Sequence, residues 1–354
     1  MKDITSINPK RILVCQLRQI GDVVLSTPSV ALLHRKYPEA EIHVLTEDKC
    51  AQVFDNNPAI SHVWRIVKKE LRNPLKALSF YRSVGRAGYD LVVDFQQLPR
   101  CRWVMMFCNA PVRLTYNPPW YNRLLYTNWP EFIPGGYAAK YKAGVLKPLG
   151  IEWDGERPEI FVSEQERKQA GACLKSLGVG PVDPLITVDP SHRRHTRRWP
   201  AAHMGRLLRL VSEQRPEFRF FLIYGPGEKD VAVEVKDISG LGDKCVMLDK
   251  PGSLRLMAAL IERAELHIGH CSAPRHFAVG VGTPTVTIPG SSSSAWTFPS
   301  PEHVEVVPDL DCQPCGSESC TRGDLACLVQ LMPEDVLKRV LEKIQDSPSV
   351  KAAL

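Results

Sequence analysis

Apolar runs of strand length alternate with segments of helical spacing along the first half of the chain. Residues 11–15, 41–45 and 90–94 are short and mostly apolar, which is typical of buried strands in a parallel sheet. Residues 23–36 place apolar side chains at helical spacing between the first two runs. A basic segment over about 71–87 has a helical pattern as well. Strands that alternate with helices predict a parallel sheet covered on both faces.

A second alternating series fills the rest of the chain. Its predicted strands are 185–189, 219–224, 265–269 and 285–288, and its predicted helices are 201–213, 254–264, 273–281 and 333–344. The glycine- and proline-rich stretch 178–184 precedes this series and is typical of a linker. The sequence therefore predicts an α/β protein of two parallel-sheet domains, 1–177 and 178–354. The expected ligand site is the cleft between them, at the carboxyl ends of the strands.

Residues 112–140 fit neither pattern. They are rich in aromatic residues and proline, and we expect an irregular loop there. Long loops in enzymes often form lids or binding surfaces, but a packed surface excursion explains the composition equally well.

Composition narrows the class of protein. The 354 residues are 44% apolar and 24% charged, which is ordinary globular usage. A net charge of +6 is too small to argue for nucleic acid and fits a protein that handles anionic small molecules or works beside an anionic membrane. We find no secretory signal and no apolar run of membrane-spanning length, and therefore expect a soluble, cytoplasmic protein.

Several motifs in fixed order resemble one enzyme family. They are the run from Cys15 to Pro28, Asp94-Phe95-Gln96, Arg198-Trp199-Pro200, the run from Gly269 to His276, and the run from Val281 to Val286. Together they are similar to the motifs of the family 9 glycosyltransferases, whose best-known members are the ADP-heptose:lipopolysaccharide heptosyltransferases. The resemblance implies the GT-B fold, in which two Rossmann-like domains bind the acceptor and the nucleotide sugar respectively.

The same resemblance implies an activity. Family members transfer a sugar with inversion of configuration and need no metal for the transfer. Here it implies a metal-independent glycosyltransferase that moves a heptose from ADP-heptose onto a lipopolysaccharide inner-core acceptor. Such an enzyme would meet the cytoplasmic face of the inner membrane peripherally and would bind no nucleic acid. Two other classes stay open, a non-catalytic or altered-donor protein of the same fold and a nucleotide-sugar epimerase.

Asp22 is the candidate catalytic residue. It follows a glycine in the turn after the first predicted strand, where a carboxylate can take the proton from an attacking hydroxyl. The alternative is an ordinary helix cap, for which aspartate is a favoured residue. The family resemblance favours the general base.

The candidate donor site lies in the second half. By resemblance, Arg197 with Arg198 and Thr196 would hold the donor diphosphate, and guanidinium groups suit phosphate because of their bidentate geometry. A solvated basic loop is the alternative. Ser272 and Ala273 open a helix, and the free N–H groups of its first turn would bind an anion. By resemblance, Glu228 would approach the nucleoside, and a plain turn is the alternative.

The chain departs from the family at two donor positions. His270 and Cys271 stand where the family has Asn-Asp, and that aspartate is thought to hold sugar hydroxyls. A thiol is a weaker acceptor than a carboxylate, so either another residue grips the sugar or the donor differs. Among the basic residues of the first half, Arg100 and Arg102 are candidates for acceptor binding, with plain surface charge as the alternative.

Four of the eleven cysteines form a cluster, Cys312, Cys315, Cys320 and Cys327. Thiolates at this spacing suit a structural zinc ion or an iron–sulfur cluster. Free thiols and an internal disulfide remain as alternatives, because the spacing is not that of a standard zinc ribbon.

Overall fold

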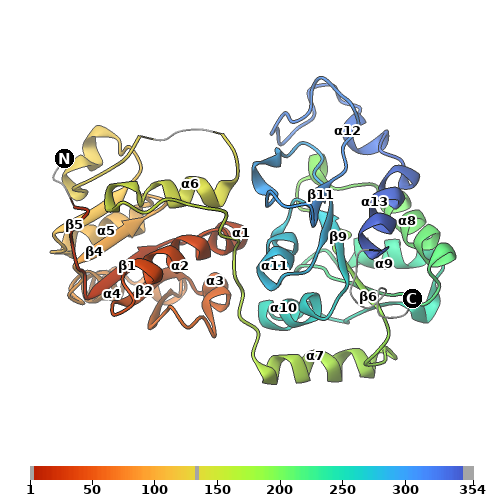
Figure 1. The fold of residues 1–354 in the computed structure, drawn as a ribbon, viewed down its shortest axis with the longest axis horizontal. Coiled ribbons are helices and arrows are strands. Elements are labelled where there is room, and N and C mark those ends of the chain that lie inside the picture. Colours follow the sequence, from red (N-terminus) through yellow and green to blue (C-terminus); the bar gives the residue numbers. More distant parts are fainter. Residues whose placement is uncertain (1–3, 132–134, 346–354) are drawn as a thin grey trace. The chain divides into compact units, whose positions relative to one another are not determined.

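The computed structural model describes residues 4–131 and 135–345, and the chain divides into two compact units, Met1–Phe161 and Val162–Leu354 (Figure 1). Each unit contains one sheet, and every strand pair in both sheets is parallel. The two parallel α/β sheets confirm the predicted fold class.

Unit 1 has a five-stranded sheet in the order β3-β2-β1-β4-β5. Its strands are β1 Arg11–Cys15, β2 Glu41–Glu47, β3 His62–Ile66, β4 Leu91–Asp94 and β5 Val112–Thr115. Its helices are α1 Ile20–Val24, α2 Thr27–Lys36, α3 Asp48–Ala51, α4 Pro74–Gly85, α5 Pro99–Phe107 and α6 Ala138–Gly144, with the 3-10 turns η1 Gln52–Phe54, η2 Glu70–Arg72, η3 Trp120–Leu125 and η4 Lys147–Leu149.

Unit 2 has a six-stranded sheet in the order β11-β10-β9-β6-β7-β8. Its strands are β6 Leu185–Val188, β7 Arg219–Leu222, β8 Cys245–Met247, β9 Leu266–His270, β10 Thr285–Ile288 and β11 His303–Glu305. Its helices are α7 Glu164–Ser176, α8 Ala201–Gln214, α9 Lys229–Ser239, α10 Leu254–Glu262, α11 Ala273–Val281, α12 Ala326–Val329 and α13 Pro333–Gln345, with the 3-10 turns η5 His195–Arg197, η6 Gly242–Lys244 and η7 Ser294–Trp296.

The central strands are buried on both faces, as the continuous apolar runs predict. In β1, Ile12, Leu13 and Val14 are fully buried. Leu13 joins the core between the sheet and helices α4 and α5. Successive side chains of a strand point to opposite faces, so Ile12 and Val14 face the side of the sheet opposite Leu13. Both faces of the sheet must therefore be covered by helices. In unit 2, Figure 1 shows α10 and α11 on one face of the sheet and α8, α9 and α13 on the other.

Two local predictions need correction. The single helix expected over residues 23–36 is two helices, α1 and α2, because Pro28 opens a new first turn at the start of α2. The irregular loop expected over residues 112–140 begins with a strand, β5, and contains η3. Strand β5 is short and lies beside β4, so its pairing rather than its composition decides its conformation.

The boundary between the units lies before α7, not in the glycine- and proline-rich stretch 178–184. Helix α7 packs against α10 of unit 2, and Arg255 donates two hydrogen bonds to the Glu166 carboxylate, at 2.7 and 2.8 Å. Arg167 forms a second ion pair with Glu262, at 2.8 Å. The turn residues after α7 therefore connect two elements of one unit, and the predicted boundary after residue 177 was wrong.

Within the residues described, the structure has no helix that is long and apolar enough to cross a membrane.

The packing of α8 against α9 generates a stability prediction. A Cβ atom added at Gly205 would lie 2.7 Å from Cγ2 of Ile238 and 3.1 Å from the backbone nitrogen of Ser239. We expect Gly205→Ala to lower the free energy of unfolding of unit 2 by about 1–3 kcal/mol through overpacking. The exposed helical Gly171 has nothing within 4 Å of an added Cβ, so Gly171→Ala should raise it by about 0.5–1 kcal/mol. Urea unfolding followed by circular dichroism measures both, and equal midpoints for the two variants would contradict the prediction.

Candidate active site

Asp22 lies in the first turn of α1, just beyond the carboxyl end of β1. Its Oδ2 accepts a hydrogen bond from the backbone N–H of Gln19 at 3.4 Å, so it does cap the helix. Its Oδ1 lies 3.4 Å from Nζ of Lys142, and the side chain stays 29% exposed. The capping contact uses only one oxygen, and the carboxylate remains open to a second molecule.

Lys142, from α6, is the site residue that the sequence did not reveal. Its ammonium group is mostly buried, donates to Oε1 of Gln16 at 3.0 Å and lies 5.9 Å from the centre of the Phe95 ring. Burial lowers the pKa of Lys142, and the nearby Asp22 carboxylate opposes that shift. No local sequence signal marks this lysine, because only the fold brings α6 to the turn after β1.

The segment Asp94-Phe95-Gln96 supports the Asp22 turn. Oε1 of Gln96 accepts hydrogen bonds from the backbone N–H groups of Leu17 and Arg18, at 2.9 and 3.2 Å. Asp94 is fully buried and accepts from the Tyr126 hydroxyl at 2.6 Å and from the N–H of Gln96 at 2.9 Å. Burial raises the pKa of Asp94, while these hydrogen bonds oppose the rise. The motif therefore ties the end of β4 to the loop that precedes Asp22.

Three cations surround the buried carboxylate of Glu47 at the carboxyl end of β2. Arg100 and Lys68 each approach it to 2.9 Å and Lys49 to 3.7 Å. Burial disfavours the ionised form, but the three cations outweigh it and lower the pKa of Glu47. The predicted acceptor residues are separated, because Arg100 joins this cluster whereas the guanidinium of Arg102 lies 5.9 Å from the centre of the Tyr121 ring. Helix positions two apart point in different directions.

In unit 2, the neighbouring strands β9, β6 and β7 end at one edge of the sheet. The loop after β6 and the loop after β7 are joined through Glu228, whose Oε2 accepts from the Ser191 hydroxyl at 2.8 Å and from the N–H of Gly225 at 3.0 Å. The carboxylate of Glu228 is thus held at this edge by partners from two loops.

Ser272 joins the third loop to the same group. It is the N-cap residue of α11, and its hydroxyl donates to Oδ2 of Asp189 rather than capping its own helix. Asp189 is only 3% exposed, and this burial raises its pKa to about 7 although the Ser272 hydrogen bond opposes the rise. Ala273, the first residue of α11, follows directly, so the first-turn N–H groups lie at this edge.

Arg197 ends the 3-10 turn η5 in the loop between β6 and α8. Its Nε is buried and has no hydrogen-bond partner within the described residues. Guanidinium N–H groups are strong donors to anions, so this unpaired N–H is a candidate partner for an anionic ligand. Arg198 is exposed, whereas Thr196 is buried and its hydroxyl donates to the Ser317 carbonyl at 3.0 Å. Thr196 therefore fixes the loop, and Arg197 is its best-placed cation.

His270 and Cys271 both turn toward the interior of unit 2. His270 is fully buried, and its Nε2 accepts from the N–H of Trp199 at 2.9 Å. Burial lowers the pKa of His270 to about 3, so it is a neutral acceptor. The sulfur of Cys271 accepts from Arg275 at 3.2 Å and from Ser292 at 3.0 Å. Their positions favour support of the loop over the predicted direct contact with a donor.

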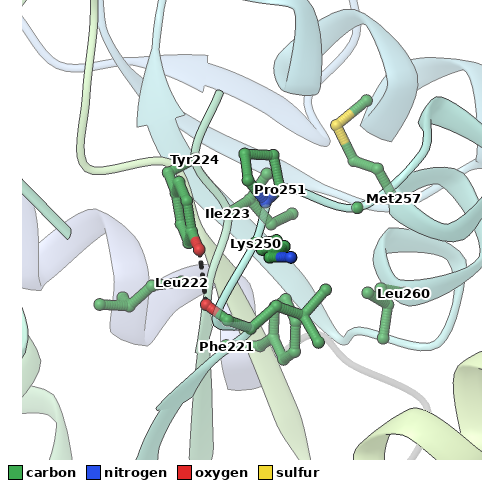
Figure 2. Close-up of a pocket in the computed structure, with 10 residues that line it drawn as sticks. Phe221, Leu222, Ile223, Tyr224, Lys250, Pro251, Met257 and Leu260 are labelled. Atoms are coloured by element: carbon green, nitrogen blue, oxygen red, sulfur yellow. Dashed lines mark hydrogen bonds between the residues drawn. The ribbon is translucent and has the colours of Figure 1, made fainter. Parts of the chain in front are cut away.

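A small, largely apolar pocket of about 40 Å³ lies at the end of β7 (Figure 2). Its walls include Tyr224 from the strand end, Lys250 and Pro251 from the loop between β8 and α10, and Met257 from α10. The Tyr224 hydroxyl donates to the Leu248 carbonyl at 2.6 Å, which fixes the ring at the pocket wall. Figure 2 draws this bond as a dashed line from the labelled Tyr224. A pocket of this volume has room for a few water molecules.

The cysteine cluster does not form a metal centre in this structure. Its four residues line one cavity of about 400 Å³, together with Thr196 and Ser291. Across residues 4–131 and 135–345, however, no group of three or more His, Cys, Asp or Glu side chains is arranged to hold a metal ion. The predicted zinc or iron–sulfur site therefore has no structural support. All eleven cysteines are free, so the disulfide alternative is not formed either.

A family model described as glycosyltransferase family 9 (heptosyltransferase) matches residues 77–326. This chain belongs to glycosyltransferase family 9. Lipopolysaccharide heptosyltransferase 3 of Escherichia coli is 24% identical over 300 residues, which cover 80% of this chain and 84% of that protein. Lipopolysaccharide heptosyltransferase 1 of Campylobacter coli is 21% identical over 345 residues, which cover 95% and 99%.

Solved structures of the family share the fold. A family 9 glycosyltransferase from Veillonella parvula DSM 2008 superimposes with a TM-score of 0.81 at 22% identity, covering 96% of this chain and 98% of that one. The E. coli ADP-heptose lps heptosyltransferase II gives a TM-score of 0.76 at 17% identity, covering 94% and 98%. The predicted family and GT-B fold are confirmed, and the protein is a glycosyltransferase.

The buried carboxyl of this family 9 enzyme generates a prediction about pH. Asp189 has an ordinary pKa of 3.8 and a folded pKa of about 7, so from about pH 4 to 7 it ionises only on unfolding and the folded state loses stability as the pH rises. Asparagine does not ionise. We expect Asp189→Asn to be more stable than the wild type above pH 7, by at most about 4 kcal/mol, and to lose that advantage near pH 4. Thermal unfolding at several pH values measures it, and a difference that does not change with pH would contradict the assignment.

Proposed function

We propose that this glycosyltransferase transfers a heptose from ADP-heptose onto a hydroxyl group of a lipopolysaccharide inner core. The observation that carries the proposal is the edge of the unit 2 sheet, where the unpaired Nε–H of Arg197 and the first turn of α11 are candidate ligands for an anion. The names of the family relatives support the substrate class. An E. coli heptosyltransferase of similar fold, with a TM-score of 0.72 at 18% identity, was solved with ADP-2-deoxy-2-fluoro heptose.

The donor diphosphate would lie between Arg197, Arg198 and the N-terminus of α11 at Ser272 and Ala273. Guanidinium and backbone N–H groups neutralise the charge that grows on the ADP oxygen as its bond to the anomeric carbon breaks. These groups supply the electrostatic stabilisation that a divalent cation provides in other phosphate-releasing enzymes, so no cofactor is needed for the transfer.

The nucleoside would occupy the β7 side of the same edge. The apolar side chains beside Tyr224 would contact the base, and Glu228 follows Tyr224 closely in the chain. The Glu228 carboxylate already accepts two hydrogen bonds at one oxygen. Its remaining lone pairs suit ribose hydroxyl groups.

Asp22 would act as the general base. The partly exposed carboxylate has lone pairs beyond those that face Gln19 and Lys142, and one of them would accept the proton of the acceptor hydroxyl. The hydroxyl oxygen would attack the anomeric carbon from the face opposite ADP, which inverts the configuration. Nζ of Lys142, 3.4 Å from Oδ1, would hold the carboxylate in position. Arg100, Lys68 and Lys49 would meet the acidic groups of the acceptor. A lipid-linked acceptor would bring the protein to the cytoplasmic face of the inner membrane.

Two alternatives make different predictions. The observation for a non-catalytic or altered-donor protein is Cys271. Its sulfur accepts a hydrogen bond from Arg275 and is therefore not available to accept one from a donor sugar. UDP-GlcNAc 2-epimerases share the fold at a TM-score of 0.51, and an epimerase would form product without an acceptor. Incubation of the purified protein with ADP-heptose, with and without core acceptor, separates all three.

The base assignment predicts that Asp22→Asn loses about 10²–10⁴-fold in transfer rate, because the amide cannot accept the hydroxyl proton. The fold and ADP affinity should be unchanged. Asp48→Asn is the matched control, since Asp48 is an exposed aspartate in the first turn of α3 in the same unit. Equal rates for Asp22→Asn and the wild type would remove Asp22 from the mechanism.

The anion site predicts that Arg197→Ala weakens ADP binding by roughly 10–150-fold, the effect of losing a charged hydrogen bond. Isothermal titration calorimetry measures the Kd. Arg206→Ala serves as control, because Arg206 is an exposed arginine of α8 that pairs with Glu334. If only the control weakens ADP, or if neither does, the diphosphate binds elsewhere.

A further inference from the structure

Helix α5 and the turn η3 carry a surface of large apolar side chains that the core does not use. The exposed fractions are 44% for Trp103, 61% for Met106, 80% for Trp120, 57% for Tyr121 and 92% for Leu124. We call these five residues the α5–η3 patch. Single exposed apolar residues are common, but five large ones on two adjoining elements are not explained by folding.

The members of the patch lie on one continuous surface. Helix α5 packs against η3, and the Trp120 and Tyr121 rings lie 5.8 Å apart. The Arg102 guanidinium, on the same helical face as Met106, lies 5.9 Å from the Tyr121 ring and so bridges the two elements. The opposite face of α5, with Cys101, Val104 and Met105, is buried in unit 1. The patch is therefore the outward, apolar side of an element whose inner side is anchored in the core of unit 1.

Basic side chains lie around the patch. Residues 95–130 contain four arginines and no aspartate or glutamate, but Arg100 is paired with Glu47 and Arg113 donates to backbone carbonyl groups. Arg102 and Arg123 lie among the apolar side chains, and the Arg123 guanidinium lies 6.0 Å from the centre of the Trp129 ring. The neighbouring helix α4 adds the exposed Leu75 and the basic Lys76. Apolar and cationic side chains are therefore mixed on this surface.

This chemistry fits an anionic lipid surface. Tryptophan and tyrosine prefer the boundary between headgroups and acyl chains, where their rings contact apolar matter and their polar atoms stay hydrated. Leucine and methionine contribute apolar area, while arginine attracts lipid phosphate. Aromatic residues, methionine and arginine are also enriched in protein interfaces, so a second copy of this chain is the occupant that the test must distinguish from lipid.

We propose that the α5–η3 patch inserts into the headgroup region of an anionic bilayer, with Trp120 and Leu124 entering deepest and with Arg102 and Arg123 meeting lipid phosphates. The proposal deepens the membrane contact included in the proposed function and names the surface that makes it. It rests on unit 1 alone and is independent of which sugar is transferred.

Sedimentation with vesicles tests it on the full chain. The wild type should bind phosphatidylcholine vesicles that contain phosphatidylglycerol, should bind pure phosphatidylcholine at least about 10-fold more weakly, and should be released by salt. The double variant Trp120→Ser/Leu124→Ser should lose at least about 10-fold in affinity for the anionic vesicles. Val182→Ser is the matched control, because Val182 is an 88% exposed apolar residue of unit 2, and its binding should equal that of the wild type.

Several results would overturn the proposal. One is that the wild type does not bind anionic vesicles. Another is that Val182→Ser loses as much affinity for these vesicles as the double variant does. A third is that the wild type is a dimer in solution and that the double variant abolishes the dimer while vesicle binding persists. Transfer to a lipid-free core oligosaccharide should be the same for the double variant and the wild type. Loss of vesicle binding by the double variant, with its transfer rate intact, supports membrane binding through the patch. Absence of transfer by the wild type would refute the proposed function, and the vesicle result would still decide the membrane proposal.

Discussion

The parallel pairing of every strand is the constraint on which both candidate sites depend. In a parallel sheet all carboxyl ends lie at one edge, so loops that are distant in the chain must meet there. In unit 2 the order β9-β6-β7 brings together Ser272, Asp189 and Glu228, each from a different loop. In unit 1 the pairing of β1 with β4 places Gln96 beside the turn of Asp22. Strand order therefore decides which loops meet at each edge and can contribute side chains to a site.

Buried polar groups make these edges rigid. Asp94 and Asp189 are removed from water, which disfavours their charged forms and raises the pKa of each. Each retains hydrogen-bond donors from a neighbouring element, Tyr126 for Asp94 and Ser272 for Asp189. A buried acceptor without such donors would be costly, so the network tolerates few alternative loop conformations. The loops that would hold a substrate are thus positioned by carboxyl groups that lie beneath them.

The departure from the family at His270 and Cys271 has a structural explanation. His270 binds the backbone at Trp199, and Cys271 meets the buried Arg275 and Ser292. These contacts fix the loop between β9 and α11 from inside the unit. The departure from the family therefore concerns two residues that hold this loop from within unit 2.

The sequence alone determined the features that depend on local pattern or ordered motifs. Apolar periodicity predicted the two parallel sheets, because buried strands and helices each give a characteristic spacing of apolar residues over a short window of sequence. The motif order predicted family 9 and the positions of Asp22, Arg197 and Ser272. Turn composition did not predict the unit boundary correctly at residues 178–184. Glycine and proline indicate a turn, but they do not indicate to which unit the elements on either side belong.

Tertiary structure decided what depends on contacts between distant segments. It placed Lys142 beside Asp22, buried Asp189 under Ser272, separated Arg100 from Arg102 and joined α7 to unit 2 through the Glu166–Arg255 pair. Within residues 4–131 and 135–345 it gave no group of metal-ligating side chains at the four closely spaced cysteines, and it combined the exposed apolar residues of α5 and η3 on one surface. The reason is common to all of these features. The partners and burial of a side chain depend on how elements that are far apart in the chain pack together. Local periodicity and motif spacing do not predict that packing.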